Sequence, residues 1–486
     1  MTQKDLKPAA VFHYFEEICK VPRPSKREEK MVEFLKNFGK SHGLETKCDE
    51  AGNVLIKKAA TKGKEHLPTV ILQSHVDMVC EKNGDVEHDF LNDPIETYVD
   101  GEWLRAKGTT LGADNGIGVA TELAILAADN IEHGPLECLF TTDEETGLTG
   151  AFALKPGFMD GDILINLDSE DEGELFIGCA GGIDTVAEMT YQPAKAPEDY
   201  FFFRIDVKGL AGGHSGDDIN KKRANANKIL TRFLVRINRI MDLHLCKIDG
   251  GNLRNAIPRE AYAICAVPMN EKERVRVELN VFTAEVEAEY SVTEPGMKLS
   301  LQSELPEKWA IDKDTAARLL KALTGVHHGI YAMSQEIDGL VETSSNLASV
   351  KMTEENTIRI ATSQRSSILS ARDHMTDTVG AVFELAGAKV TRSDGYPGWK
   401  PNPHSGILEV AVASYKRLFG TEPKVKAIHA GLECGLFLEK YPSLDMFSFG
   451  PTLRGVHSPD ERMLIPSVER FWKHLLDILA NIPAKK

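Results

Sequence analysis

Two segments near the start of the chain, residues 9–20 and 28–39, carry apolar residues at the spacing of an amphipathic α-helix. Residues 116–128 are mostly apolar, which is typical of a buried helix. The chain also contains short apolar runs typical of buried strands, at residues 53–56, 69–72, 136–141 and 162–166. Strands that alternate with helices predict an α/β fold, in which an open, mostly parallel sheet is flanked by helices.

The pattern changes near residue 185. The stretch YQPAKAPEDY (191–200) resembles a linker, and the alternating run FFFRIDVKG then begins a strand. After residue 392, a helical segment at 406–420 and the region around His457 return to the first pattern. We therefore predict a catalytic domain of residues 1–184 and 393–486, into which an α+β domain of residues 185–392 is inserted.

Acidic and histidine side chains follow several of the apolar runs, where each run gives way to a loop rich in Gly, Ser or Asp. In open α/β sheets, sites form beside the carboxyl ends of the strands, so residues far apart in the sequence can meet in one cleft. Five of these residues are suitable ligands for two divalent cations: His75, Asp114, Glu145, Asp168 and His457. No cysteine belongs to the set, which argues against a structural zinc site.

Asp114 lies on a turn flanked by glycine and is the natural bridge between two cations. His75 and Asp168 would complete the ligands of one cation. Glu145 and His457 would complete those of the other. A ligand set of histidine and carboxylate is suited to zinc, manganese or cobalt, and we expect two zinc ions. Two cations held in this way polarise a carbonyl group and activate water near neutral pH, so the pattern predicts a two-metal hydrolase.

Asp77 and Glu144 stand beside predicted ligands. Asp77 is two residues from His75, where its carboxylate could accept the second ring N–H of the imidazole. Neighbouring side chains diverge, so Glu144 is better placed as a general base than as a ligand of the cation that Glu145 binds. It would take a proton from the metal-bound water and deliver it to the leaving amine. Such an arrangement hydrolyses amides.

The composition of the chain excludes some classes of binding partner. The chain has 486 residues and a net charge of −16, which argues against nucleic acids and anionic membranes as partners. No apolar run approaches the roughly 18 residues that span a bilayer, and the first residues lack the apolar core of a signal peptide. The eight cysteines are spread along the chain with no CxxC pair, which is typical of a protein in a reducing compartment. We therefore expect a cytoplasmic protein.

Several motifs occur in order over nearly the whole chain, among them LQSHVDMV, TLGADNGIGVA, TTDEETGLTGAF, INLDSEDEGE, GGHSG, LRNAIPRE and GPTLRGVHSPDERM. Through them the chain resembles the aminoacylase and carboxypeptidase family of co-catalytic zinc peptidases, and within it the bacterial aminoacyl-histidine dipeptidases. The resemblance implies the metal ligands named above, with Asp77 and Glu144 as the catalytic pair. It also implies a cis peptide bond between Asp114 and Asn115. The implied substrates are unblocked dipeptides, including Xaa-His dipeptides such as carnosine.

The resemblance further implies that the inserted domain acts as a lid. His214 in GGHSG would stabilise the oxyanion of the tetrahedral intermediate. Asn255 and Arg365 would bind the carboxylate at the C-terminus of the substrate, for which arginine offers a bidentate fork. Glu433 lies in the shared segment HAGLECGLF, and contact with the amino group of the substrate is one role for it. Residues 266–340 contain no motif that the resemblance interprets.

Several alternatives stay open at this point. The same scaffold could support a tripeptidase or an N-acyl-amino-acid deacylase, or a homologue that binds metal or peptide without catalysis. The intact Glu144 argues against the inactive homologue. Relatives often dimerise through the lid, so a homodimer is also open, and with it the question whether His214 serves its own subunit or the neighbouring one.

Overall fold

The computed structural model describes residues 6–484 and divides into two compact units. Unit 1 consists of Met1–Gly178, Trp399–Ala427 and Leu432–Lys486. Unit 2 consists of Cys179–Gly398 and Ile428–Gly431. The predicted division after residue 184 falls within strand β9 (Gly181–Thr190), and the division after residue 392 falls at the end of β21 (Lys389–Arg392). The catalytic and lid roles of the two parts stay predictions.

Unit 1 is built on an eight-stranded sheet of order β1-β2-β6-β3-β7-β23-β8-β22. Its central strands β6 (Leu136–Thr141), β3 (Val70–His75), β7 (Ile163–Asn166) and β23 (Asp445–Ser448) run parallel to one another. Three outer strands pair antiparallel with their neighbours: β1 (Glu45–Cys48), β2 (Val54–Lys58) and β8 (Glu174–Cys179). The last strand of the order is β22 (Lys424–Ile428). The sheet confirms the predicted open, mostly parallel architecture.

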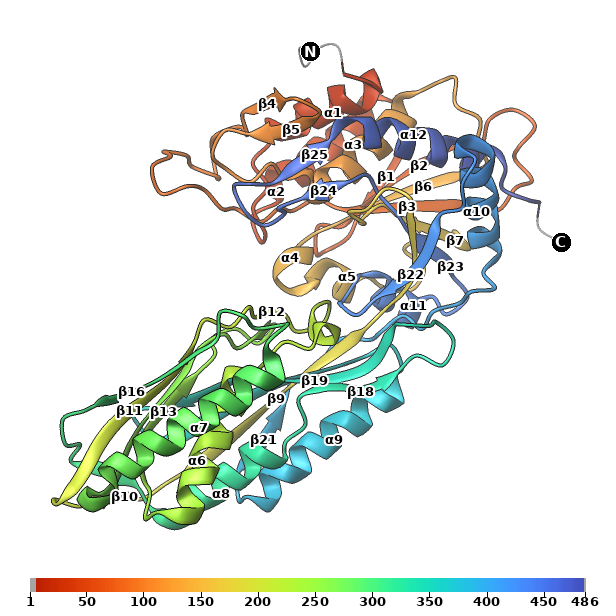
Figure 1. The fold of residues 1–486 in the computed structure, drawn as a ribbon. Helices are drawn as coiled ribbons and strands as arrows, with labels where there is room; N and C mark the ends of the chain where they lie inside the picture. The colour runs from red at the N-terminus through yellow and green to blue at the C-terminus, as the bar shows by residue number, and fades with distance from the viewer. Residues whose placement is uncertain (1–5, 485–486) are drawn as a thin grey trace. The chain divides into compact units, whose positions relative to one another are not determined.

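Helices flank this sheet (Figure 1). The helix α3 (Ala113–Ala127) packs on β3 and on α1 (Ala9–Cys19), and α2 (Glu29–Ser41) packs on β1 and β2. Near the C-terminus α10 (Gly406–Phe419) packs on β23 and on α12 (Ile465–Ala480). Three shorter helices are α4 (Glu144–Gly147), α5 (Thr149–Ala153) and α11 (Cys434–Lys440). The predicted helices at 9–20, 28–39, 116–128 and 406–420 are thus confirmed.

A small antiparallel sheet joins the C-terminal segment to the residues that precede α3. Its order is β24-β25-β5-β4, with bounds Leu453–Arg454, Arg462–Leu464, Trp103–Ala106 and Thr97–Asp100. The turn between β24 and β25 contains His457, and β5 is followed by the loop that leads to Asp114. Strand pairing therefore brings together two predicted ligands that lie at opposite ends of the sequence.

Unit 2 is built on a second, antiparallel sheet of order β16-β11-β15-β13-β19-β20-β9-β21, with β18 paired to β19. Besides β9 and β21, this sheet contains β16 (Lys298–Ser303), β11 (Tyr200–Lys208), β15 (Ala261–Pro268), β13 (His244–Gly250), β18 (Gly329–Met333), β19 (Val341–Met352) and β20 (Thr357–Ser366). The helices are α6 (Ala226–Ile240), α7 (Lys272–Tyr290), α8 (Lys313–Gly325) and α9 (Leu369–Leu385). They lie together on one side of this sheet in Figure 1.

Successive side chains of a strand point to opposite faces of the sheet, which explains why the helices cover only one face. Phe201, Phe203 and Ile205 of β11 point to one face and share a buried cluster with side chains of α6, α7 and α9. Phe202 points to the other face and belongs to a much smaller cluster. The segment 191–200, predicted as a linker, contains the short strand β10 (Pro193–Lys195), which pairs with β17 (Trp309–Ile311).

Candidate metal centre

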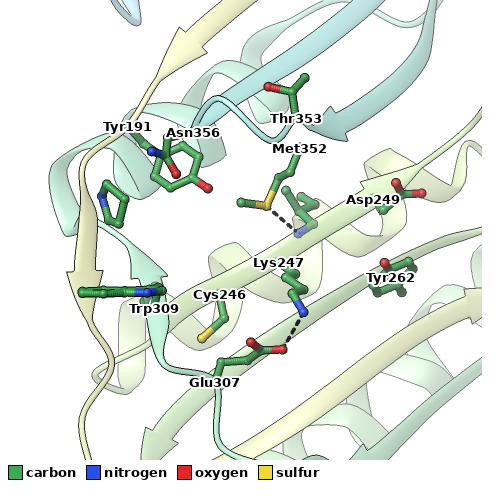
Figure 2. Close-up of a pocket in the computed structure, with 13 residues that line it drawn as sticks. Tyr191, Cys246, Lys247, Asp249, Tyr262, Glu307, Trp309, Met352, Thr353 and Asn356 are labelled. Atoms are coloured by element: carbon green, nitrogen blue, oxygen red, sulfur yellow. Dashed lines mark hydrogen bonds and ion pairs between the residues drawn. The ribbon is translucent and has the colours of Figure 1, made fainter.

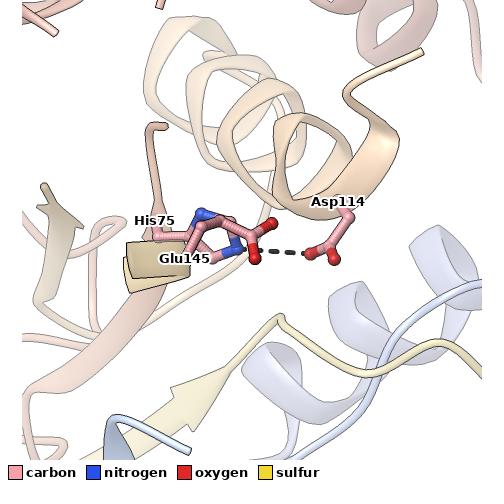
Figure 3. Close-up of side chains that lie close together, drawn as sticks. All are labelled: His75, Asp114 and Glu145. Carbon is pink, nitrogen blue, oxygen red and sulfur yellow. Dashed lines mark hydrogen bonds and ion pairs between the residues drawn. The ribbon is translucent and has the colours of Figure 1, made fainter. Parts of the chain in front are cut away.

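The five predicted metal ligands lie together in unit 1. The ligand atoms of His75, Asp114 and Glu145 all lie within 4.8 Å of one another, and Figure 3 shows these three side chains converging. His75 Nε2 lies 3.2 Å from Asp114 Oδ1 and 3.4 Å from Asp168 Oδ1. His457 Nε2 lies 3.2 Å from Asp114 Oδ2 and 3.0 Å from Glu145 Oε2. Each oxygen of the central Asp114 carboxylate therefore faces one histidine.

The topology of the sheet explains this meeting. His75 ends β3, Glu145 follows β6 and Asp168 follows β7, and these three parallel strands end at the same edge. Asp114 has non-helical dihedral angles at the start of α3, and the Asp114–Asn115 peptide bond is cis, as the resemblance predicted. The buried Asn115 side chain donates to the carbonyl of Leu167 at 2.7 Å, which ties the start of α3 to the residue before Asp168.

The carboxylates of this cluster are suited to cations. The side chains of Glu145, Asp168 and Asp114 are only 5%, 9% and 13% exposed. Buried carboxylates require compensating positive charge. Among residues 6–484, their ion-pair partners are His75 and His457, and no lysine or arginine pairs with them. A set of imidazole nitrogens and carboxylate oxygens with this geometry fits one or more divalent cations.

Asp77 anchors the segment that carries the two neighbouring glutamates. Its Oδ1 accepts the backbone N–H of Glu144 at 3.0 Å and its Oδ2 accepts that of Glu145 at 3.2 Å, so Asp77 caps the first turn of α4. Asp77 Oδ1 also lies 3.3 Å from His75 Nδ1, and Ser25 Oγ donates to Oδ2 at 2.7 Å. The carboxylate thus holds His75 and α4 in one relative position.

The surroundings of Glu144 raise the pKa of its carboxyl group. Burial raises the pKa of Glu144 well above its usual range, and although His75 opposes this, the carboxylates of Asp168 and Glu145 raise the pKa further. The neighbouring Asp143, the third acid of TTDEETG, is engaged elsewhere: its oxygens accept hydrogen bonds from Thr146 and Thr149. A carboxylate with a raised pKa can both accept and return a proton near neutral pH.

Unit 2 brings together three of the residues predicted to act on the substrate, namely His214, Asn255 and Arg365. His214 lies in β12 (Gly213–His214), which pairs with β14 (Ala256–Ile257), and Asn255 directly precedes β14. The Ser215 backbone N–H donates to the Asn255 carbonyl at 2.8 Å, and Arg365 Nε donates to Ser215 Oγ at 3.3 Å. Arg365 Nη1 also donates to Tyr396 Oη at 2.8 Å. Arg365 is buried, so within unit 2 it is part of this polar cluster and not an ordinary surface arginine.

Glu433 lies within the interior of unit 1. It is fully buried, and its Oε2 accepts hydrogen bonds from Gln73 Nε2 and Thr141 Oγ1, both at 2.7 Å. Its Oε1 has no hydrogen-bond partner among the described residues. Burial raises the pKa of Glu433 to about 7, although His75 lowers it. Contact between Glu433 and the amino group of a substrate stays a prediction.

Comparison with known proteins identifies the family. A model of peptidase family M20/M25/M40 matches residues 71–481. The chain belongs to this family. It is 44% identical, over 483 residues and 99% of each chain, to a protein of Escherichia coli K12 named cytosol non-specific dipeptidase. The predicted resemblance to co-catalytic peptidases is thus confirmed.

Solved structures of the family agree on the fold. The crystal structure of an aminoacylhistidine dipeptidase from Vibrio alginolyticus has a TM-score of 0.91 and 43% identity, and covers 100% of this chain and 99% of its own. A tripeptidase from Staphylococcus aureus has a TM-score of 0.56 and 17% identity, and covers 98% of this chain and 99% of its own. At that identity the tripeptidase shows the shared fold alone.

Unit 2 contains a hollow of about 800 Å³ that Trp309, Tyr191 and Tyr262 line (Figure 2). Two of its charged residues, Lys247 and Glu307, pair with each other at 2.7 Å, and none of the predicted site residues lines it. In the described part of the chain, every helix is too short or too polar to cross a membrane.

Two residues near the predicted ligands were not among the predicted site residues. Ser25, which donates to Asp77, precedes it by more than fifty positions, and nothing in the motif VPRPS marks it as part of the site. Glu170 lies two positions after Asp168 in the acidic run NLDSEDEGE. Burial, followed by the nearby carboxylates of Asp114 and Asp168, raises the pKa of Glu170 to about 8.

Proposed function

We propose that this protein is a metal-dependent dipeptidase that hydrolyses unblocked dipeptides, including Xaa-His dipeptides such as carnosine. Two similar proteins support the proposal: the relative named cytosol non-specific dipeptidase and the structure named aminoacylhistidine dipeptidase. The observation that carries it is the Asp114 carboxylate, whose two oxygens each face a histidine. This is the arrangement that a carboxylate bridging two cations requires. The name of the relative also supports a location in the cytoplasm.

His75 and Asp168 would hold one divalent cation, and His457 and Glu145 would hold the other, with Asp114 shared between them. We propose zinc for both positions, with manganese and cobalt as the alternatives that the same ligands accept. When bound, the two cations supply Lewis acidity, which polarises the scissile carbonyl group and makes a nearby water molecule more acidic.

Glu144 then acts as the proton carrier. With a raised pKa, its carboxylate accepts a proton from the attacking water and donates it to the amine that leaves. Asp77 keeps this base in place because it binds the backbone N–H of Glu144 and of Glu145 at the start of α4. Asp77 also lies close to His75 Nδ1, which directs the other ring nitrogen toward the cluster.

The polar cluster of unit 2 would recognise the substrate. Arg365 Nε donates to Ser215 and Nη1 donates to Tyr396, so that the guanidinium has a defined orientation in which it would bind a substrate carboxylate. Asn255 would add a hydrogen bond to that carboxylate, and His214 would donate to the developing oxyanion. Recognition of a free carboxylate one residue from the scissile bond would restrict the enzyme to dipeptides. Whether His214 acts within one subunit or across a homodimer belongs to the same proposal.

The test is hydrolysis of carnosine, Ala-His, Gly-Leu, a tripeptide and an N-acetylated amino acid by chelator-stripped protein, before and after zinc, manganese or cobalt is added. We expect metal-restored cleavage that is confined to the unblocked dipeptides. Cleavage of the tripeptide alone, or of the acetylated substrate alone, would replace the proposal by a tripeptidase or a deacylase. Bound metal without cleavage of any substrate would indicate an inactive homologue.

A further inference from the structure

The loop that carries Asp114 is held by one buried carboxylate, that of Glu461. The backbone N–H groups of Leu111 and Gly112 donate to Glu461 Oε2 at 2.7 and 2.8 Å. Those of Ala113 and Asp114 donate to Oε1 at 2.8 and 3.2 Å. Each oxygen thus accepts two donors, and Glu461 is only 2% exposed. A carboxylate is required for this, because the NH₂ group of a glutamine would face two N–H donors and accept neither.

A buried arginine holds the same loop from another direction. Arg23 Nη2 donates to the carbonyl of Gly112 at 2.6 Å, and Nη1 donates to the carbonyls of Val76 and Asp77, both at 3.1 Å. Arg23 is 2% exposed. Gly112 has a φ of +67°, and a Cβ atom at this position would lie 2.5 Å from Arg23 Nη2. The close approach of arginine and backbone therefore needs glycine at residue 112.

These two side chains connect the three loops that carry the central ligands. Glu461 lies in the β24–β25 turn, four residues after His457, and so ties the His457 loop to the Asp114 loop. Arg23 ties the Asp114 loop to the segment that follows His75. Neither residue is among the predicted ligands. Both side chains form hydrogen bonds with backbone groups of the loops.

We infer that Glu461 and Arg23 are positioning residues, which set the separation between Asp114 and the two histidines that face it. The inference rests on the proposed metal-dependent function. If it is correct, loss of either residue changes the geometry and the affinity of the metal site. If the two residues only stabilise the fold, the metal site of a folded variant is unchanged.

A matched control is available in the same unit. Glu137 is 1% exposed, and its Oε2 accepts the backbone N–H groups of Asp160 and Gly161 at 2.9 and 3.1 Å. It also pairs with Lys57 at 3.0 Å. Glu137 lies near the first residue of β6, whereas Glu145 follows the last, so the control carboxylate is remote from the ligand edge of the sheet. Glu137→Gln therefore damages a comparable backbone clamp away from the metal ligands.

The experiment compares full-length wild type, Glu461→Gln and Glu137→Gln. Zinc affinity is measured by competition with a fluorescent chelator, and the visible absorption spectrum of the cobalt-loaded protein reports ligand geometry. We expect Glu461→Gln to bind the weaker zinc ion at least about tenfold less tightly and to show a changed cobalt spectrum. Glu137→Gln should keep the wild-type affinity and spectrum even if its melting temperature falls.

Wild-type affinity and spectrum in folded Glu461→Gln would overturn the inference. If that variant does not fold, Arg23→Lys decides, because it keeps the charge and loses the planar fork that reaches three carbonyls. The inference then requires a changed cobalt spectrum in Arg23→Lys, and a wild-type spectrum overturns it. Failure of the wild-type protein itself to bind two metal ions would instead overturn the proposed function.

Discussion

The burial of His474 predicts that the free energy of unfolding falls in acid. It lies in α12, is 2% exposed, and its Nε2 donates to the carbonyl of Ala411 in α10 at 2.8 Å. The rings of Tyr415 and Phe449 lie 5.2 Å from the imidazole. Burial among these groups lowers the pKa of His474 from 6.5 to about 4, although the Ala411 carbonyl and Asp477 oppose the change. The folded protein therefore keeps this histidine neutral at pH values where the unfolded chain protonates it.

The sign and the size of the effect follow from linkage. The folded pKa is lower than the unfolded pKa, so the stability that neutral His474 contributes is complete above pH 6.5 and is lost as the pH falls to about 4. At about 1.4 kcal/mol per pH unit, this amounts to about 2 kcal/mol at pH 5 and about 3 kcal/mol near pH 4. His474→Gln keeps an N–H donor for Ala411 and removes the titration.

The assay is urea unfolding at pH 7 and pH 5, followed by circular dichroism. We expect the wild type to lose about 2 kcal/mol more than His474→Gln between these pH values. His66→Gln, at an exposed histidine, serves as the control for the substitution and should follow the wild type. Equal losses of stability in the wild type and His474→Gln would refute the reasoning.

Four further predictions concern the metal site, the substrate and a helix end. Glu144→Gln should retain its metal by elemental analysis and lose about 10²- to 10⁴-fold in kcat, whereas loss of metal would make Glu144 a ligand. Arg365→Ala should raise KM for free dipeptides much more than for C-terminally amidated ones, and equal changes would remove Arg365 from carboxylate recognition. Removal of metal by a chelator should lower the melting temperature, because the buried carboxylates lose their compensating charge, and added zinc should restore it. Lys58→Met should lower the free energy of unfolding by about 1–3 kcal/mol in urea titrations, because Lys58 Nζ donates to the carbonyls of Ile125, Leu126 and Ala128 at the end of α3. An unchanged urea midpoint would show that water replaces the ammonium group there.

Local periodicity was a sound guide to the elements of unit 1 and a weaker guide to unit 2. In unit 2, α6 begins at Ala226 because the Asn225 side chain accepts the Lys228 backbone N–H and so caps the helix there. The polar, Pro-rich stretch 191–200 forms strand β10 because β17, which is remote in the sequence, supplies its hydrogen bonds. Partners at such sequence distances leave no local pattern, so single-sequence reasoning does not detect them.

The sequence by itself determined the chemistry of the site. His75, Glu145 and Asp168 each follow an apolar run, and parallel strands end at one edge of a sheet, so their meeting follows from pattern and topology. Motifs around these residues were also enough to indicate the peptidase family that the comparisons identify. The residue types also narrowed the range of candidate metals, because imidazole and carboxylate are ligands for the same few cations.

Only the tertiary structure decided how these residues are held. The two oxygens of Asp114 face different histidines because strand β25 pairs with β5, across more than 350 positions of sequence. The clamp of Glu461 depends on four backbone N–H groups, which every residue except proline carries and which therefore leave no trace in the residue types. Side-chain identity determines which chemistry is available, and the path of the backbone determines where it occurs.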